Sequence, residues 1–290
     1  MGEQIVGVIG GSGLYELPGI AEVESLHCTT PFGAPSDELM RGRLGDATVV
    51  FLPRHGRGHR VLPSEINFRA NLFAMKQLGV EWLISVTAVG SLREHLKPAE
   101  VVIPDQFIDR TVARPSTFFG RGIVAHVSLA DPVCPILSER VEAAARAAGG
   151  TVHRGGTYIC MEGPQFSTRA ESHMYRQWGA DVIGMTAWQE AKLAREAEIC
   201  FAIMALVTDY DCWKADADHV VIGDVLRILS QNADLARRTV ASAAQQLPST
   251  RECACTHALE HAIITDRARI PAAVRSELAP LLRKYLGDPR

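Results

Sequence analysis

The sequence has no long hydrophobic run. No stretch approaches the roughly eighteen uninterrupted apolar residues that a membrane-spanning helix needs. Residues 1–4 show no basic segment followed by an apolar one, so we expect no signal peptide and a cytoplasmic protein. The net charge of -3 also lacks the basic excess of a dedicated nucleic-acid binder. We therefore expect neither a membrane nor a nucleic acid as a partner.

Cysteine is scarce too, with seven residues in a chain of 290, which is too few for a disulfide scaffold. A cytoplasmic setting favours free thiols, most of them small core residues. One group near the C-terminus is unusual: Cys253, Cys255, His257 and His261. The two histidines have the i,i+4 spacing of one helix face, but Cys-x-Cys is tighter than the usual zinc pair. We expect free thiols and no metal there, with a structural metal ion as the alternative.

The rest of the composition, 47% hydrophobic and 22% charged, is that of an ordinary globular protein. Short apolar runs that predict strands alternate with amphipathic stretches that predict helices, which is typical of an α/β fold. The pattern predicts strands over residues 5–9, 39–44, 48–52, 82–86, 101–103, 157–161, 181–183 and 199–207, and helices over 64–78, 135–148, 169–178, 190–197 and 220–247. We place residues 1–250 in this domain. Residues 251–290 are expected to form two further helices, broken near Pro271, packed on the same domain.

A glycine-rich turn, Gly10-Gly11-Ser12-Gly13, follows the first predicted strand. Glycines let backbone N–H groups turn inward and approach an anion closely, and Ser12 adds a hydroxyl donor. A dinucleotide fingerprint would need a glycine at position 16, which is Glu16, and the Lys-Ser/Thr pair of a P-loop is missing. The turn therefore suggests a small phosphate cradle, with a plain glycine turn as the alternative.

A basic loop, residues 54–60, follows the strand at 48–52. It holds three arginines, two histidines and two glycines in seven residues. The glycines favour a loop, which weakens a metal pair formed by His55 and His59. An arginine fork can bind the oxygen pairs of a phosphate, and histidine donates when protonated. A solvated basic loop is the alternative.

Two acids, Asp209 and Asp211, follow the buried run at 199–207. In an open α/β sheet, ligands bind at the carboxyl ends of strands. Carboxylates there can accept hydrogen bonds from an amino-substituted ring, and a protonated one can donate to a ring nitrogen. The plainer alternative is that Asp209 caps a turn and Asp211 faces water.

Small and hydroxyl residues recur at the other strand exits, including Thr87 and Thr186, and Phe166 offers a flat wall. Donors around an arginine describe a phosphate-ion site, and two acids with a phenylalanine describe a purine site. Together they suggest nucleoside phosphorolysis, in which phosphate attacks the anomeric carbon of a ribosyl purine.

These motifs, with Glu162-Gly163-Pro164-Gln165-Phe166-Ser167 and Met185-Thr186, resemble those of the trimeric purine nucleoside phosphorylases over about residues 4–247. The resemblance implies a phosphorylase/hydrolase-like α/β fold, a three-layer sandwich with a mixed sheet flanked by helices. It also implies a homotrimer or a dimer of trimers. Nucleoside and inorganic phosphate would be the substrates, and neither a metal nor an organic cofactor would be needed.

The resemblance also implies roles for single residues. Phosphate contacts would come from Ser12, Arg54, His55, Thr87, Ala88 and Thr186. The nucleoside would meet Phe166, Ser167, Met185, Asp209, Asp211, Ile222, Val225 and Leu226, with His126 supplied by the neighbouring subunit. Asp209 would face N7 of the base and Asp211 its 6-amino group, which makes these two acids the expected catalytic residues.

The residue types at two positions indicate which branch of the family the chain resembles. The 6-oxopurine enzymes carry Glu after the Phe and Asn at the first acid, whereas this chain has Ser167 and Asp209. An aspartate can carry a proton to N7 if its pKa is raised from about 3.9. The apolar wall at Ile222, Val225 and Leu226 favours a methylthio group over a hydroxyl at the 5′ position.

We therefore predict phosphorolysis of S-methyl-5′-thioadenosine to adenine and 5-methylthioribose 1-phosphate, a step of methionine and polyamine salvage. Alternatives are a phosphorylase for adenosine, methylthioinosine or another purine nucleoside, and a catalytically idle nucleoside-binding protein. A nicotinamide dehydrogenase is disfavoured by the glycine spacing. Two features depart from the branch: Gly184 stands where Asn is frequent, and Ala187-Trp188-Gln189-Glu190 lacks a proline before Glu. The Cys253-Ala254-Cys255 sequence is similar to one that forms a disulfide in some relatives.

Overall fold

The computed structural model describes residues 4–11, 17–214 and 222–287. Its centre is an 11-stranded mixed sheet. The strands are β1 (Gln4–Gly10), β2 (Ala21–Leu26), β3 (Leu39–Leu44), β4 (Ala47–Pro53), β5 (Trp82–Ser91), β6 (Val101–Ile103), β7 (Gln106–Arg110), β8 (Val152–Arg154), β9 (Thr157–Met161), β10 (Val182–Gly184) and β11 (Cys200–Asp209).

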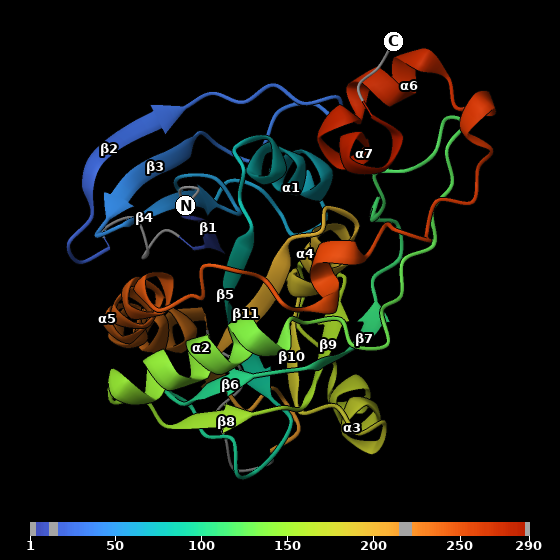
Figure 1. The fold of residues 1–290 in the computed structure, drawn as a ribbon. Coiled ribbons are helices and arrows are strands. Elements are labelled where there is room, and N and C mark those ends of the chain that lie inside the picture. Colours follow the sequence, from blue (N-terminus) through green and yellow to red (C-terminus); the bar gives the residue numbers. More distant parts are fainter. Residues whose placement is uncertain (1–3, 12–16, 215–221, 288–290) are drawn as a thin grey trace.

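Helices cover both faces of this sheet. They are α1 (Phe68–Gln77), α2 (Pro135–Ala147), α3 (Arg169–Gln177), α4 (Ala187–Glu196), α5 (Ile222–Gln245), α6 (Ala272–Glu277) and α7 (Ala279–Leu286), with 3-10 turns η2 (Ala254–His257) and η3 (Arg267–Arg269). On one face α2 and α5 pack together and against β11, and on the other α4 packs on β5 and β11 beside α1 and α7 (Figure 1). The predicted three-layer α/β sandwich is confirmed.

The side chains between the layers form two large hydrophobic clusters, one on each face of the sheet. Residues that alternate along one strand belong to opposite clusters. In β1, Val6 and Val8 belong to the cluster beneath α2 and α5, and Ile9 belongs to the cluster beneath α1 and α4. Burial on both faces explains why the central strands are nearly continuous apolar runs.

Strand β5 is the point at which the sheet branches. On one edge, its first half pairs with β1 in parallel, ending at Ile9 opposite Ser85. On the same edge of β5, the last residues, Gly90 and Ser91, pair antiparallel with β10. Its other pairing, with β11, runs from Trp82 as far as Gly90. Residues 86–89 therefore have a strand neighbour on the β11 side, while on the other side β1 has ended and β10 has not begun.

Three local predictions were wrong. Helix α1 begins at Phe68 rather than near Ser64. Residues 106–110, for which the sequence pattern predicted no strand, form the edge strand β7. The chain between α5 and Pro271 contains 3-10 turns instead of an α-helix, although α6 and α7 do follow Pro271. Within the described residues, no helix is long and apolar enough to span a membrane.

Candidate active site

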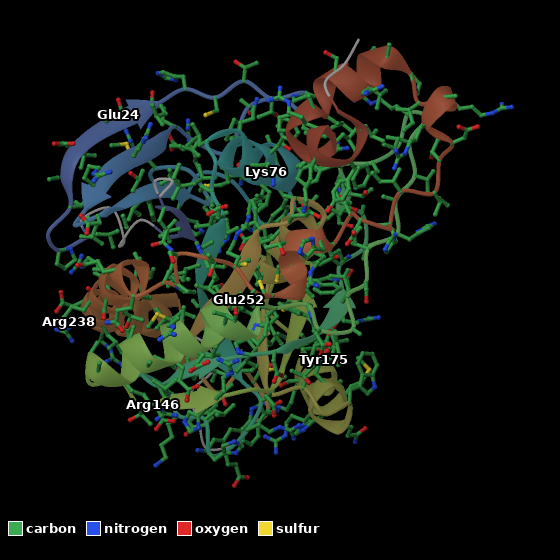
Figure 2. All side chains as sticks on the ribbon, viewed as in Figure 1. Glu24, Lys76, Arg146, Tyr175, Arg238 and Glu252 are labelled. Carbon is green, nitrogen blue, oxygen red and sulfur yellow. The ribbon has the colours of Figure 1, made fainter. Side chains whose placement is uncertain are left out.

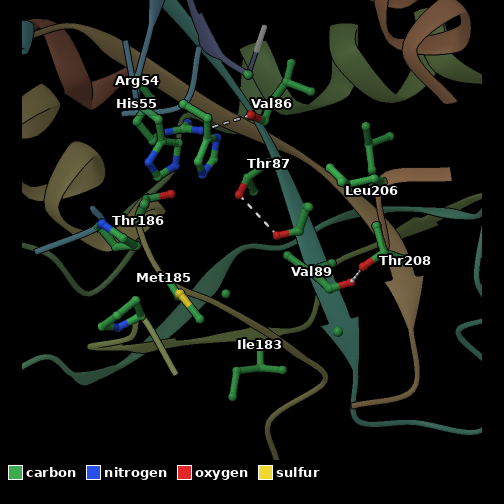
Figure 3. A pocket seen from close by; sticks show the side chains of 18 of the residues that line it. Arg54, His55, Val86, Thr87, Val89, Ile183, Met185, Thr186, Leu206 and Thr208 are labelled. Carbon is green, nitrogen blue, oxygen red and sulfur yellow. Dashed lines mark hydrogen bonds between the residues drawn. The ribbon is translucent and has the colours of Figure 1, made fainter. Parts of the chain in front are cut away.

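A cavity of about 720 Å³ opens where β5 lacks its second neighbour. Residues 86–90 of β5 form its floor, and residues from β11, β10 and α5 and from the basic loop surround them. Figure 3 shows Arg54, His55, Thr87 and Thr186 gathered toward one end, with Met185 and Ile183 toward the other. Arg54 and Asp209 line this same cavity, as the strand-end argument predicts. The volume suits a ligand the size of a nucleoside with an anion.

Arg54 is 2% exposed and is held by α4. Its Nε donates to Glu190 Oε1 at 2.5 Å and its Nη2 to Glu190 Oε2 at 3.1 Å. Nη2 also donates to Ser85 Oγ at 2.7 Å, and Nη1 to the carbonyl of Val86 at 3.2 Å. The predicted bidentate fork toward phosphate is wrong, because Glu190 occupies the fork. These bonds use four of the five guanidinium N–H groups, which leaves one Nη1 hydrogen for an anion.

His55 presents an acceptor to the cavity. Its Nδ1 lies 2.9 Å from the carbonyl oxygen of Val61, which only accepts, so Nδ1 carries the hydrogen. Burial, with the charge of Arg54, lowers the pKa of His55 to about 4. The ring is therefore neutral near pH 7, and Nε2 offers a lone pair. The expectation that His55 donates as a cation is not supported, because a neutral ring has one N–H and Val61 uses it.

Two hydroxyls complete this end of the cavity. Thr87 comes from the open stretch of β5 and lies beside Ala88, whose carbonyl accepts from Thr87 Oγ1 at 3.3 Å. Thr186 is the N-cap of α4 and makes no side-chain capping bond. The positive end of the α4 dipole thus lies behind the Thr186 hydroxyl, which favours an anion there.

Asp209 ends β11 in a closely packed position. An added Cβ at Gly90 would lie 3.1 Å from Asp209 Oδ1, so the glycine allows the acid to approach β5. The Asp211 backbone N–H donates to Oδ1 at 2.7 Å. Thr208 Oγ1 lies 2.6 Å from Oδ2 and 3.2 Å from the carbonyl of Val89.

Thr208 has one hydroxyl hydrogen for two acceptors. If it donates to Val89, its short contact with Asp209 requires a proton on the carboxyl group. Burial raises the pKa of Asp209, which favours this arrangement. The geometry therefore allows Asp209 to hold a proton at the cavity.

Asp211 is 5% exposed, and its Oδ2 has no hydrogen-bond partner among the described residues. Burial, assisted by the charge of Asp209, raises its pKa to about 6. A buried acceptor without a donor is costly, which favours the protonated form of this carboxyl group.

The opposite end of the cavity is largely apolar. Phe166, 43% exposed, and Met185 line it, and Leu226 on α5 forms part of its wall. Ser167 is not among the lining residues, but its backbone carbonyl accepts from the thiol of Cys212, next to Asp211.

Arg114 links several segments near this end of the cavity through hydrogen bonds, and the sequence did not predict it. Its side chain is 2% exposed and donates to the carbonyls of Met185 and Glu162, to Gln189 Oε1 at 3.2 Å and to Glu162 Oε1 at 3.2 Å. No sequence signal marks it, since it stands in an irregular segment far from its partners. Glu190 on α4 and Ser85 on β5 were missed because they lie 136 and 31 residues from Arg54 in the sequence.

Gly184 accommodates a tyrosine from the neighbouring strand. A Cβ at position 184 would lie 1.9 Å from Tyr158 Oη, and Tyr158 is fully buried. The hydroxyl of Tyr158 thus takes the space that an asparagine at 184 would need. This explains how the chain accommodates its departure from the pattern of the branch.

Several predicted residues are not placed in this cavity. Ser12 lies outside the described residues, as do the side chains of Ile222 and Val225. His126 is exposed and does not line the cavity; its backbone N–H donates to the carbonyl of Ala262 at 2.9 Å. Its predicted role concerns a neighbouring subunit and stays a prediction.

The assembled groups combine an anion end, an apolar slot and two buried acids in one cavity. Such a cavity can hold a phosphate beside a nucleoside and protonate a departing base.

Comparisons with known proteins agree with this geometry. The family model described as the phosphorylase superfamily matches residues 5–245. The S-methyl-5′-thioadenosine phosphorylase of Geobacter sulfurreducens is 57% identical, covering 98% of this chain and 100% of that protein. The protein of the same name from Koribacter versatilis is 55% identical, over 98% and 97%.

Solved structures that resemble this chain carry the same enzyme name. A methylthioadenosine phosphorylase from an Antarctic soil metagenomic library superposes with a TM-score of 0.90 at 48% identity, covering 97% of this chain and 99% of that one. The methylthioadenosine phosphorylase of Schistosoma mansoni in complex with adenine gives 0.81 at 36%, over 89% and 96%. The family resemblance seen in the sequence is confirmed, and this chain belongs to the phosphorylase superfamily.

Proposed function

We propose that this protein cleaves S-methyl-5′-thioadenosine with inorganic phosphate, releasing adenine and 5-methylthioribose 1-phosphate. The observation that carries the proposal is the convergence of Arg54 and Thr186 with Asp209 and Asp211 on one cavity. Relatives of that name at 55–57% identity over nearly the whole chain support the choice of substrate.

In this proposal the phosphate occupies the end formed by Arg54, His55, Thr87, Ala88 and Thr186. The single available N–H of Arg54 and the hydroxyls donate to its oxygens. The neutral Nε2 of His55 accepts from its P–OH group, so the site suits hydrogen phosphate, which has both donor and acceptor oxygens.

The nucleoside lies against Phe166 and Met185, with its base toward the acids. As the C1′–N9 bond breaks, the sugar becomes oxocarbenium-like and a phosphate oxygen forms the new bond to C1′. The electron pair of the broken bond goes to the purine. Asp209 passes its proton to N7, and the carboxyl group of Asp211 accepts from the 6-amino group. Asp209 and Asp211 are therefore the proposed catalytic residues.

We also propose that the active protein is a homotrimer or a dimer of trimers, with His126 contributed to the neighbouring 5′ pocket. Val124 and Ile264 lie beside His126 and are 44% and 63% exposed, and Ile264 N–H donates to the Val124 carbonyl. Exposed apolar side chains of this kind are favoured at subunit interfaces. Sedimentation velocity tests the assembly.

Two further expectations remain proposals. Catalysis here uses only residues of the chain and phosphate, without a catalytic metal or organic cofactor. The protein belongs to the cytoplasm, a location supported by seven unpaired cysteines.

The decisive experiment measures base release from methylthioadenosine, adenosine, methylthioinosine and inosine, each with and without phosphate. We expect cleavage of methylthioadenosine only with phosphate, and faster than that of the other three. Cleavage without phosphate, or none at all, would refute phosphorolysis. Faster turnover of adenosine would favour the adenosine phosphorylase alternative.

The proposed acid is tested by Asp209→Asn, which keeps the shape but cannot donate a carboxyl proton. We expect kcat for methylthioadenosine to fall about 100-fold or more. The KM for phosphate should change little, because Asp209 lies at the base end. Unchanged turnover in this variant would remove Asp209 from the mechanism.

A further inference from the structure

Four cysteines from three distant parts of the chain meet in one cluster, which we call the four-cysteine cluster. Cys134 precedes α2, Cys200 begins β11, and Cys253 and Cys255 flank Ala254 after α5. Their Sγ atoms all lie within 4.8 Å of one another, and Cys200 and Cys253 are 3.3 Å apart. Glu252, labelled in Figure 2, marks the segment that brings the last two cysteines to the sheet.

The separations fit one tetrahedral ion. Zinc binds thiolates at about 2.3 Å, so the sulfurs of a tetrahedral site made of four cysteines are about 3.8 Å apart. The 3.3 Å separation of Cys200 and Cys253 and the upper limit of 4.8 Å for every pair are compatible with that value. Iron–sulfur clusters place several metal ions between the ligand sulfurs and need a wider spacing.

The cluster is enclosed by the protein and reaches solvent at one member. Cys134, Cys200 and Cys255 are buried, at 0%, 0% and 3% exposed, and Cys253 is half-buried and gives access from solvent. Cys134 is the N-cap of α2, whose positive dipole end favours a thiolate.

We propose that the four-cysteine cluster binds a single zinc ion as a structural site. The ion would join the start of α2, the start of β11 and the C-terminal segment. Cys134 and Cys200 are already tied together, since the Cys134 backbone N–H donates to the Phe201 carbonyl at 2.7 Å. The two added thiols, Cys253 and Cys255, would fasten the tail to this pair.

The ligand set differs from the one considered in the sequence. His257 and His261 are exposed and take no part, and Cys134 and Cys200 replace them. The site is also remote from the cavity. Cys200 and Asp209 stand at opposite ends of β11, about 30 Å apart at 3.3 Å per residue. Its role is therefore structural, and catalysis should not depend on it directly.

The test uses the full-length protein in reductant, stripped of metal and titrated with Co²⁺. We expect about one equivalent bound, with the sulfur-to-cobalt charge-transfer absorption and strong visible bands of a tetrahedral thiolate site, displaced by one equivalent of Zn²⁺. Protein purified from zinc-supplemented cells should carry zinc in the same ratio.

Two variants give the comparison. Cys253→Ser removes the most accessible ligand and should abolish the stoichiometric absorption and lower the thermal midpoint measured with zinc. Cys28→Ser, a half-buried thiol outside the cluster, should retain both. Phosphorolysis at low temperature should survive in both variants.

Three results would overturn the proposal. One is the absence of the charge-transfer band from reduced wild-type protein. Another is equal cobalt binding by wild type and Cys253→Ser. The third is an intact mass lower by the four thiol hydrogens in protein kept under reductant, which would mean that the cysteines pair as disulfides.

Discussion

At the residue scale, Asp211 is a carboxyl group kept from water and from any donor to its Oδ2 among the described residues. Burial raises its pKa to about 6, against about 3.9 in an unfolded chain. The fold thus favours the protonated form. The stability that this contributes is complete below pH 3.9 and is lost as the pH rises through 6. Above pH 6 the ionised group costs about 3 kcal/mol relative to its protonated state.

Asp211→Asn should remove this pH dependence, because an amide does not titrate. We expect the free energy of unfolding of the variant, relative to wild type, to rise by about 2–3 kcal/mol between pH 4 and pH 8. Urea denaturation at both pH values measures it. Asp234→Asn is the control, since Asp234 is 60% exposed and pairs with Arg237 and Arg238 at the surface, where such pairs contribute little. Parallel pH profiles for wild type and Asp211→Asn would contradict the prediction.

At the scale of elements, α1 is started by a side chain that the sequence reasoning passed over. Asn67 Oδ1 accepts from the Ala70 backbone N–H at 3.1 Å, and Nδ2 donates to the Phe32 carbonyl at 2.7 Å. Asn67 therefore caps the helix and also fastens it to the loop after β2. Ser64, which follows Pro63, has the composition of a helix start but is exposed and lies outside the helix.

Asn67→Ala should lower the free energy of unfolding by about 1–2 kcal/mol, since it removes a cap and a tether. Ser64→Ala, the matched change at the position that the sequence favours, should have almost no effect. Chemical denaturation of both variants measures the difference. Equal losses in the two would mean that capping at Asn67 does not stabilise α1.

Which strands could be predicted from the sequence depended on how deeply each strand is buried. Strands buried on both faces, such as β1, β4 and β11, are apolar runs and were found with small errors at their ends. Strand β5 was predicted only over residues 82–86 but continues to Ser91, so Thr87 lies inside the strand and not at its exit. Strands β2, β7 and β8 were missed because they are not buried apolar runs: β2 and β7 are exposed or half-buried, and β8 has only three residues. The side of the cavity formed by strand ends followed from α/β topology alone.

The contacts inside the cavity were less predictable. Glu190 takes the fork of Arg54 from 136 residues away, and no local pattern encodes that pairing. The tautomer of His55 likewise depends on Val61, in a loop whose path the sequence does not fix. Residue types thus indicated the chemistry, while tertiary contacts determined which hydrogens remain for a ligand.

At the scale of the whole molecule, Glu198 fastens residues 251–287 to the α/β domain. It is 6% exposed and accepts from the Leu259 backbone N–H at 3.1 Å, from Lys284 Nζ at 3.1 Å and from the Tyr285 hydroxyl. Apolar residues of the same segment belong to the hydrophobic cluster under α1 and α4, among them Leu278, Leu281 and Leu282. We infer that the segment and the domain unfold together in one cooperative transition.

Glu198→Gln should lower the free energy of unfolding by about 2 kcal/mol, because charge-assisted bonds to Lys284 and Tyr285 are lost in a buried place. The thermal transition should stay single and move down by about 4 °C. Glu277→Gln is the control. Glu277 lies in the same segment and pairs with Arg121, but the Glu277 side chain is 40% exposed and that of Arg121 is 56% exposed. Loss of this ion pair should therefore change the free energy of unfolding by less than about 0.5 kcal/mol. Thermal melts followed by tryptophan fluorescence, with hydrogen exchange over residues 251–287, measure both. Exchange of that segment well before the domain melts would mean that it docks as an independent unit, held by something other than Glu198.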